Sequence, residues 1–270
     1  RWSAPLPRVF VWRRFSTARQ RRNKVMGKPW ISGLLNLMGD FLFPGNCPVC
    51  GDAPFADPGS YACRECMDRI AWIRGNGCRI CGLPMWGMGF GGLTCRACRE
   101  DPPVFQSGRC LFLLDETGKK VIHEIKYHGV RPVLRDLPHW LERTPGTLEF
   151  LEGCDLVPVP LHRKRLRARG FNQSAWIARA LSDAAGGKPR VREALRRISD
   201  PPTQTSLDRE TRKANVKDAF ALCSRSPIDE QSPIVLVDDV YTTGATLDSC
   251  ARVLVEGGCR VVKFLALGRG

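Results

Sequence analysis

The sequence of 270 residues lacks any apolar run long enough to cross a membrane. A membrane-spanning helix needs roughly 18 or more apolar residues in succession. The sequence also has no secretory signal ahead of its cysteines, which disfavours a secreted, disulfide-bonded scaffold. At 43% hydrophobic residues, it has enough apolar side chains to build a buried core. We therefore expect a soluble, cytoplasmic protein with no membrane span.

Acidic residues are absent from the first 25 positions, which hold eight basic residues in a chain of formal net charge +15. A basic, acid-free and partly apolar arm is typical of a transit peptide or of a tail that binds nucleic acid. A second interpretation is an upstream artefact of the assigned start, because the chain opens on Arg1 and Met26 leads directly into the first cysteine motif. We predict that residues 1–40 are a basic arm that is either disordered or such an artefact.

Eight of the thirteen cysteines form four C-x-x-C pairs. Two pairs lie 12 residues apart and the next two lie 13 residues apart, a spacing that can gather four thiolates around each of two zinc ions. Disulfides are disfavoured, because C-x-x-C loops make poor structural bridges. Sequential and cross-braced pairing both stay open. The predicted zinc ligands, as a set, are Cys47, Cys50, Cys63, Cys66, Cys78, Cys81, Cys95 and Cys98.

These zinc sites are expected to be structural, because thiolates would fill every coordination position and leave none for water or substrate. Residues 41–104 are too few and too rich in glycine to form a core without metal, so we predict a double zinc ribbon domain there. The remaining five cysteines fall in or near apolar strands and helices, where small buried side chains are common. They are Cys110, Cys154, Cys223, Cys250 and Cys259.

From Cys110 onward, short apolar runs alternate with helical patterns, which is typical of a parallel α/β domain. We therefore predict an α/β fold for residues 105–270, in which helices flank a parallel sheet. The run 191–199 is ambiguous and is assigned only weakly to a strand. The expected strands are 110–116, 154–161, 234–237 and 259–269, and the expected helices are 119–129, 171–187 and 247–258.

The stretch "IVLVDDVYTTGAT" carries the main candidate site. Its strand leads into Asp238 and Asp239, and ligands of open parallel sheets bind at the carboxyl ends of strands. The small residues of the next loop, Thr242, Thr243, Gly244, Ala245 and Thr246, precede a helix, whose N-terminus suits a phosphate. Carboxylates at one end and a phosphate cradle at the other fit a ribose 5-phosphate. The alternative is a threonine N-cap with ordinary turn chemistry.

Two further segments carry many cations. "HRKRLRARG" follows a predicted strand and would form a basic loop on the same rim as the phosphate cradle, able to bind pyrophosphate or a nucleic-acid backbone. Residues 196–220 form a long polar stretch with prolines that would close over a ligand as a lid. The alternatives are a solvated basic turn and a flexible surface excursion. Aromatic side chains that could stack on bases are few: Trp72, Trp86 and Phe90.

The stretch around Asp238 resembles the 5-phosphoribosyl-1-pyrophosphate (PRPP) motif of type I phosphoribosyltransferases. Together with the cysteine pairs, "VPVPLHRKRLRARGFNQS" and "RISDPPTQTSLDRETRKANV", it resembles the ComF family from about Leu42 to the C-terminus. The resemblance implies that the acids hold ribose hydroxyls and that residues 242–246 hold the 5-phosphate. It further implies a pyrophosphate loop at Pro158, Val159, Pro160 and Leu161, cationic contacts from Arg165 and Arg169, a flexible loop with Gln204, Arg209, Arg212 and Asn215, and a Lys-Tyr position at Lys126 and Tyr127.

Two functions of different classes follow from this resemblance. One is a phosphoribosyltransferase that displaces pyrophosphate from C1 of the ribose, with Asp238, Asp239, Arg165 and Arg169 as the catalytic residues and Mg²⁺ as the cofactor. The other is a non-catalytic protein that senses PRPP or binds single-stranded DNA. No motif indicates an acceptor nucleophile. The expected partners are PRPP, single-stranded DNA, proteins of DNA uptake or recombination, and a second copy of the chain in a homodimer.

Overall fold

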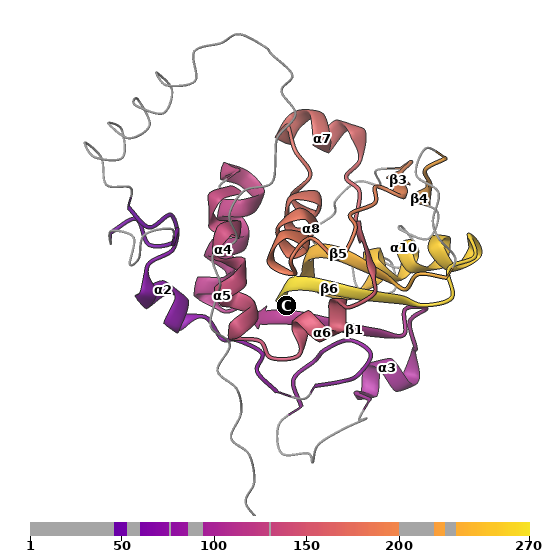
Figure 1. Cartoon of the computed structure of the whole chain (residues 1–270), viewed down its shortest axis with the longest axis horizontal. Helices are drawn as coiled ribbons and strands as arrows, with labels where there is room; N and C mark the ends of the chain where they lie inside the picture. Colours follow the sequence, from indigo (N-terminus) through magenta and orange to yellow (C-terminus); the bar gives the residue numbers. More distant parts are fainter. Residues whose placement is uncertain are drawn as a thin grey trace, which may run out of the picture. The chain divides into compact units, whose positions relative to one another are not determined.

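Four parallel strands form the central sheet, in the order β1, β6, β5 and β2 (Figure 1). The computed structural model describes residues 46–52, 60–75, 77–85, 94–129, 131–199, 219–224 and 231–270. The apolar and β-branched runs of the sequence supply the strands, because such side chains pack well on a pleated sheet. The strands are β1 (Ser107–Leu113), β2 (Asp155–Pro158), β5 (Ile234–Tyr241) and β6 (Val262–Arg269).

Each face of this sheet is buried in its own hydrophobic cluster. Alternate residues of β5 show this, because Val235 and Val237 belong to one cluster whereas Ile234 and Leu236 belong to the other. Several helices contribute buried side chains to the first cluster. Figure 1 shows three of them, α4, α5 and α8, beside the sheet. These elements are α4 (Glu116–His123), the π-helix η1 (Glu124–His128), the 3-10 helix η2 (Arg131–Asp136), α5 (Leu137–Glu142), α6 (Thr147–Leu151) and α8 (Gln173–Ala184).

The second face has fewer helices. Among the described elements, α10 (Ala245–Glu256) packs on it, together with a two-stranded antiparallel sheet of β3 (Leu195–Arg197) and β4 (Phe220–Leu222). Phe105 adds an aromatic contact to Phe264, with ring centroids 4.9 Å apart. The parallel α/β architecture predicted from the sequence is therefore confirmed, and helices or short strands cover both faces.

The cysteine-bearing segments are built into the same two clusters. Cys47, Cys63 and Cys66 belong to the first cluster, and the cysteines from Cys78 to Cys98 belong to the second. Residues 44–270 form one compact unit, so the chain on both sides of the expected boundary at residue 104 shares its buried side chains. The short helices α2 (Arg64–Arg69) and α3 (Arg96–Glu100) each begin directly after a cysteine.

Two buried or half-buried aspartates join the first cysteine segment to the helical layer. Asp136 is 2% exposed and accepts hydrogen bonds from the backbone N–H groups of Tyr61 and Ala62, both at 2.9 Å. Asp115 accepts one from the N–H of Ala71 at 2.9 Å while it caps helix α4. Because the carboxylates sit on the helical layer and the donors on the cysteine segment, these bonds fix one against the other.

Both edges of the sheet are protected by backbone contacts. Trp72 bridges Phe112 of β1 in the antiparallel sense, and Val191 bridges Leu156 of β2 in the parallel sense. An edge strand with free N–H and C=O groups can pair with a strand of another chain. These backbone contacts therefore disfavour edge-to-edge association of the sheet. None of the helices in the described ranges has the length and apolar character of a membrane span.

The structure differs from the sequence-based expectations in three places. Strand β5 runs to Tyr241 rather than ending at Val237, because β6 is long enough to pair with it up to Arg269. The expected basic loop is a helix, α7 (Arg163–Arg169), none of whose residues is buried. The helices α5 and α6 had no counterpart in the sequence prediction. The N-terminal arm and most of the predicted lid, including Gln204, Arg209, Arg212 and Asn215, lie outside the described residues.

Candidate functional site and metal centres

The two adjacent acids lie in the second half of β5, beside the end of β2. Pro158, the last residue of β2, is in register with Val237, so Asp238 is the first residue of β5 beyond the neighbouring strand. Its Oδ1 accepts hydrogen bonds from Ser174 Oγ at 3.0 Å and from the backbone N–H of Asp239 at 2.9 Å. The acids are thus inside a strand, contrary to the expected position at its exit, yet they still lie at the carboxyl edge of the strand pair.

Asp239 is 4% exposed and pairs with Lys126, whose Nζ lies 3.2 Å from Oδ1. The other oxygen, Oδ2, is buried and has no hydrogen-bond partner within the part of the chain that the structure describes. A buried carboxylate oxygen without a donor is costly, and such groups are rare outside functional sites. Oδ2 therefore offers an acceptor for a hydroxyl group or a metal ion.

Burial, together with the neighbouring charge of Asp239, raises the pKa of Asp238 to about 7. The N–H of Asp239, the charge of Lys126 and the hydroxyl of Ser174 act in the opposite direction. Two carboxylates side by side favour a shared proton unless a cation arrives. The acid pair is thus prepared for a ligand that carries positive charge or hydrogen-bond donors.

The predicted phosphate loop connects β5 to α10. Gly244 has φ 79°, and a Cβ at this position would lie 2.5 Å from the Tyr241 hydroxyl oxygen, so only glycine fits the turn. Helix α10 begins at Ala245, whose N–H donates to Thr243 Oγ1 at 3.4 Å. The first turn of this helix therefore lies one short loop after the strand that carries the acid pair, and its dipole presents positive charge where a phosphate is expected.

The predicted pyrophosphate loop lies next to the acids. Pro158 ends β2, and the N–H of Val159 donates to the Val237 carbonyl at 2.9 Å. Asn172 Nδ2 donates to the Val159 carbonyl at 3.1 Å and its side chain caps α8. The loop is therefore held between β5 and the start of α8, the helix that also contributes Ser174 to Asp238.

Arg169 reaches the same region from helix α7. Its guanidinium donates to Gln173 Oε1 at 2.6 Å and lies over the Tyr127 ring, 5.3 Å from the centroid. Tyr127 follows Lys126, which pairs with Asp239, so contacts link Arg169 to the acid pair through one turn of η1. Arg165 lies one turn before Arg169 on α7, and both side chains are partly buried. The remaining cations of α7, Arg163, Lys164 and Arg167, are exposed.

A cleft of about 690 Å³ opens between α7, α8 and β3. It includes Pro158 and Pro160 of the predicted pyrophosphate loop, but its lining does not include residues 238–246. A second cleft of about 500 Å³ shares Trp176 and Arg179 with it and adds Arg131 and Arg135. The two clefts thus meet at Trp176 and are rich in arginine.

The structure shows an aromatic pair at this junction that the sequence analysis missed. Phe171 stacks on Trp176 with ring centroids 3.9 Å apart and an interplanar angle of 7°. By contrast, Trp72 packs in the core against Phe112 and Trp140, so it is a poor candidate for base stacking. Trp86 and Phe90 lie outside the described residues. The sequence feature that could have revealed this stacked pair is two aromatic residues, five positions apart, that follow the basic segment 163–169.

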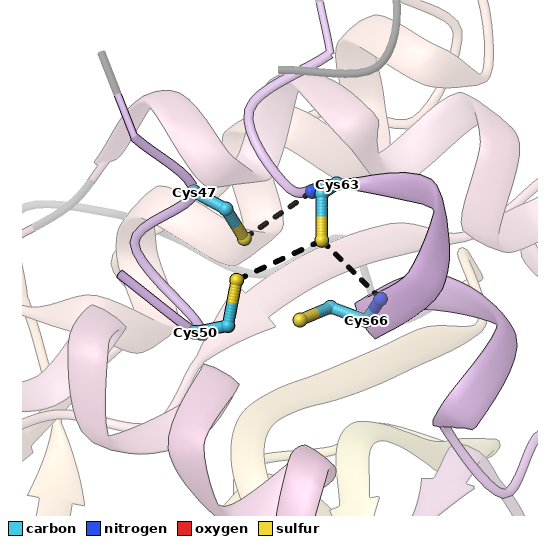
Figure 2. Close-up of side chains that lie close together, drawn as sticks. All are labelled: Cys47, Cys50, Cys63 and Cys66. Carbon is cyan, nitrogen blue, oxygen red and sulfur yellow. Dashed lines mark hydrogen bonds between the residues drawn. The ribbon is translucent and has the colours of Figure 1, made fainter. Parts of the chain in front are cut away.

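The eight paired cysteines form two clusters with sequential pairing. Figure 2 shows the first, where four sulfurs converge from the knuckle at Cys47 and Cys50 and from the start of α2 at Cys63 and Cys66. Cys50 Sγ lies 3.8 Å from Cys63 Sγ, as expected for two thiolates about 2.3 Å from one tetrahedral zinc. The N–H of Cys63 donates to Cys47 Sγ at 3.2 Å (Figure 2).

The second cluster has the same form. Cys78, Cys81, Cys95 and Cys98 place their sulfurs within 4.8 Å of one another, and Cys81 Sγ lies 3.7 Å from Cys95 Sγ. All thirteen cysteines are free of disulfides. Burial raises the pKa of the Cys66 and Cys98 thiols, so a cation is needed to hold four thiolates together. The two clusters therefore fit two structural zinc ions.

Removal of one zinc site is expected to loosen the whole unit, because each cluster is part of the hydrophobic packing of one sheet face. Freshly purified, reduced protein should contain two zinc ions per chain by mass spectrometry. Cys47→Ser with Cys50→Ser should lower that content to one and lower the melting temperature of the α/β unit, whereas Cys223→Ser, outside both clusters, should change neither. One zinc or none in the unaltered chain would contradict the two-site model.

The raised pKa of Asp238 predicts a pH-dependent stability. The folded chain binds this proton more tightly than the unfolded chain, so the stabilisation is complete below the ordinary pKa of about 4 and is lost as pH rises towards 7. The slope is at most about 1.4 kcal/mol per pH unit. Urea unfolding should show that Asp238→Asn gains stability relative to the unaltered chain between pH 5 and pH 8. The exposed control Asp183→Asn should show a constant difference, and a constant difference for Asp238→Asn would refute the assignment.

The comparisons with known proteins agree with these features. A family model described as a double zinc ribbon domain matches residues 38–99. The chain is 31% identical to the DNA utilization protein YhgH of Salmonella typhi over 84% of this chain and 97% of the relative. It is 25% identical to the competence protein ComFC of Bacillus subtilis over 74% of this chain and 80% of the relative. The match to competence protein F of Haemophilus influenzae is 30% over 48% of this chain and 62% of that protein.

The solved structures that match include the purine phosphoribosyltransferase from Pyrococcus horikoshii Ot3, at 16% identity over 51% of this chain and 80% of that chain. Its TM-score of 0.29 is too low to carry any conclusion. The sequence relatives are sufficient to assign the family, because the 31% identity to YhgH extends over nearly the full length of that protein. The chain belongs to the ComF family.

Proposed function

We propose that this chain binds PRPP with Mg²⁺ at the edge formed by β5, the loop to α10 and the end of β2, as a protein of the phosphoribosyltransferase type. The observation that carries the proposal is the acid pair. Asp239 Oδ2 is buried without a donor among the described residues, and Asp238 has a pKa raised to about 7. Both carboxylates would gain partners from the hydroxyls of a ribose and from a divalent cation.

The carboxylate oxygens of Asp238 and Asp239 are the ligand type that Mg²⁺ prefers. When bound, Mg²⁺ would neutralise charge on the pyrophosphate. Residues 242–246 would hold the 5-phosphate at the start of α10, and Pro158–Pro160 would line the pyrophosphate path. Arg165 and Arg169 would stabilise the negative charge of the departing pyrophosphate, which is the main electrostatic demand of displacement at C1. Lys126 would hold the Asp239 carboxylate in its orientation.

The relatives named for competence and DNA utilization support a role for this chain in DNA uptake. A transferase and a PRPP sensor would share the same ligand site. They differ in whether pyrophosphate is released, so a release assay with and without single-stranded DNA separates them.

Replacing both acids by amides should weaken PRPP binding at least tenfold. Each lost charge-assisted hydrogen bond costs about 1.5–3 kcal/mol, and about 1.4 kcal/mol corresponds to a factor of ten. Calorimetric titration of Asp238→Asn/Asp239→Asn with PRPP and Mg²⁺ tests this. The exposed control Asp183→Asn should bind as the unaltered chain does. Equal affinity in a folded double variant would show that the acids do not hold PRPP.

A second candidate function, binding of single-stranded DNA, is favoured by the two clefts that meet at Trp176. Proteins that bind single strands combine cationic grooves with aromatic rings on which bases stack. Here the stacked pair of Phe171 and Trp176 lies between Arg131 and Arg135 in one cleft and Arg163 in the other. This surface adjoins the predicted pyrophosphate loop, so both functions can coexist in one chain.

If DNA follows these clefts, its affinity should fall with salt, with a slope of about 0.7 per contacted phosphate. Alanine at the three exposed cations of α7, Arg163, Lys164 and Arg167, should reduce the slope by roughly two units. A charge-matched control, Lys119→Ala/Lys188→Ala/Arg260→Ala, removes exposed cations elsewhere and should leave the slope unchanged. Fluorescence anisotropy with a labelled oligonucleotide provides the measurement. Absence of DNA binding at low salt by zinc-loaded protein would remove this candidate.

A further inference from the structure

A third cluster of metal-ligating side chains lies outside the cysteines, where helix α4 ends at His123 and the π-helix η1 continues to His128. His123, Glu124 and His128 place one ligand atom each within 4.8 Å of one another. The Nδ1 atom of His128 lies 2.8 Å from Glu124 Oε2, and that of His123 lies 3.6 Å from Glu124 Oε1. The two imidazoles therefore face one carboxylate from two sides.

The π-helix is what gathers these residues. In an α-helix, residues five apart differ by about 140° around the axis and point away from each other. In a π-helix the hydrogen bonds join residues five apart, so His123 and His128 come to the same side. Gly129 completes the turn with φ 62°, and its N–H donates to the Glu124 carbonyl. A π-helix of one turn is rare and is frequently found at functional sites.

We propose that His123, Glu124 and His128 bind a divalent transition-metal ion, separate from the two tetracysteine centres. Two imidazoles and one carboxylate are donors suited to Zn²⁺, Ni²⁺ or Co²⁺ rather than to Mg²⁺. Two ligands on opposite sides of one ion span at most about 4.2 Å, so a modest rotation of the imidazoles closes the site. Both imidazole side chains are more than half exposed, at 54% and 58%, which leaves them free to rotate.

The position of the cluster gives the ion a consequence for the candidate ligand site. Lys126 lies on the same turn and its Nζ is 3.2 Å from Asp239 Oδ1. An ion held by His123 and Glu124 before Lys126 and by His128 after it would fix the backbone between them, and so fix the cation that faces the acid pair. This consequence rests on the proposed PRPP binding, whereas the metal site itself does not.

The test is nickel binding by tag-free protein that retains its two zinc ions. Equilibrium dialysis followed by mass spectrometry should find one nickel per chain beyond the zinc. His128→Gln and Glu124→Gln should each abolish nickel binding. The matched control is His139→Gln, because His139 is exposed and pairs with Glu142 at 3.5 Å, and no third ligand joins them among the residues that the structure describes. No bound nickel, or nickel retained by both folded variants, overturns the site. Glu124 is only 17% exposed, so its replacement can disturb folding. If Glu124→Gln fails to fold, the nickel binding of the exposed His128→Gln variant decides the test.

The coupling is tested by PRPP titration with and without nickel. PRPP should bind several-fold more tightly to the nickel-loaded chain, and the difference should vanish in His128→Gln. By linkage, PRPP should tighten nickel binding by the same factor. Equal PRPP affinity with and without bound nickel overturns the coupling. Nickel binding without any PRPP binding overturns the proposed function and leaves the metal site standing.

Discussion

A parallel sheet is stable only when both of its faces are kept from water, and this requirement governs how the chain is assembled. Helices α4, α5 and α8 cover one face, whereas α10 and the β3–β4 pair pack on the other. The tetracysteine centres complete both layers, one on each face. Zinc bound at these centres would therefore stabilise the packing of the sheet as well as the cysteine segments that hold it, since the free energy of metal binding contributes to folding.

Carboxylates play two opposite roles around this sheet. Asp136, Asp115 and Asp248 each accept backbone N–H groups from the cysteine segments or from the segment that follows them. Their hydrogen bonds are satisfied, so they fix one layer against another. Asp239, by contrast, is buried beside Asp238 with one oxygen, Oδ2, that has no hydrogen-bond partner among the described residues, which costs stability. Groups that the fold leaves unsatisfied at a strand edge are those that a ligand can satisfy.

The sequence was sufficient for features that depend on local pattern. The C-x-x-C spacing predicted the two cysteine clusters, and the apolar runs predicted β1, β2, β5 and β6. The sequence did not predict helix α7, because a short helix with no buried residue has no apolar periodicity to detect. It failed for the π-turn at η1, because the change from i→i+4 to i→i+5 bonding leaves no composition signal. The extension of β5 through the acids depends on the length of β6, a partner that local pattern does not reveal.

The position of β6 also sets the order in which the chain can fold during synthesis. Ser107 of β1 pairs with Lys263 of β6, so β1 has no partner in the sheet until residues roughly 150 positions later have emerged. The first tetracysteine centre, by contrast, needs only Cys47 to Cys66, which are close in sequence. Metal capture can therefore come early and sheet closure late. Until β6 arrives, β1 can pair only with the segment before it, where the N–H of Ile73 donates to the Leu111 carbonyl, so the edge of β1 that later meets β6 stays open for most of synthesis.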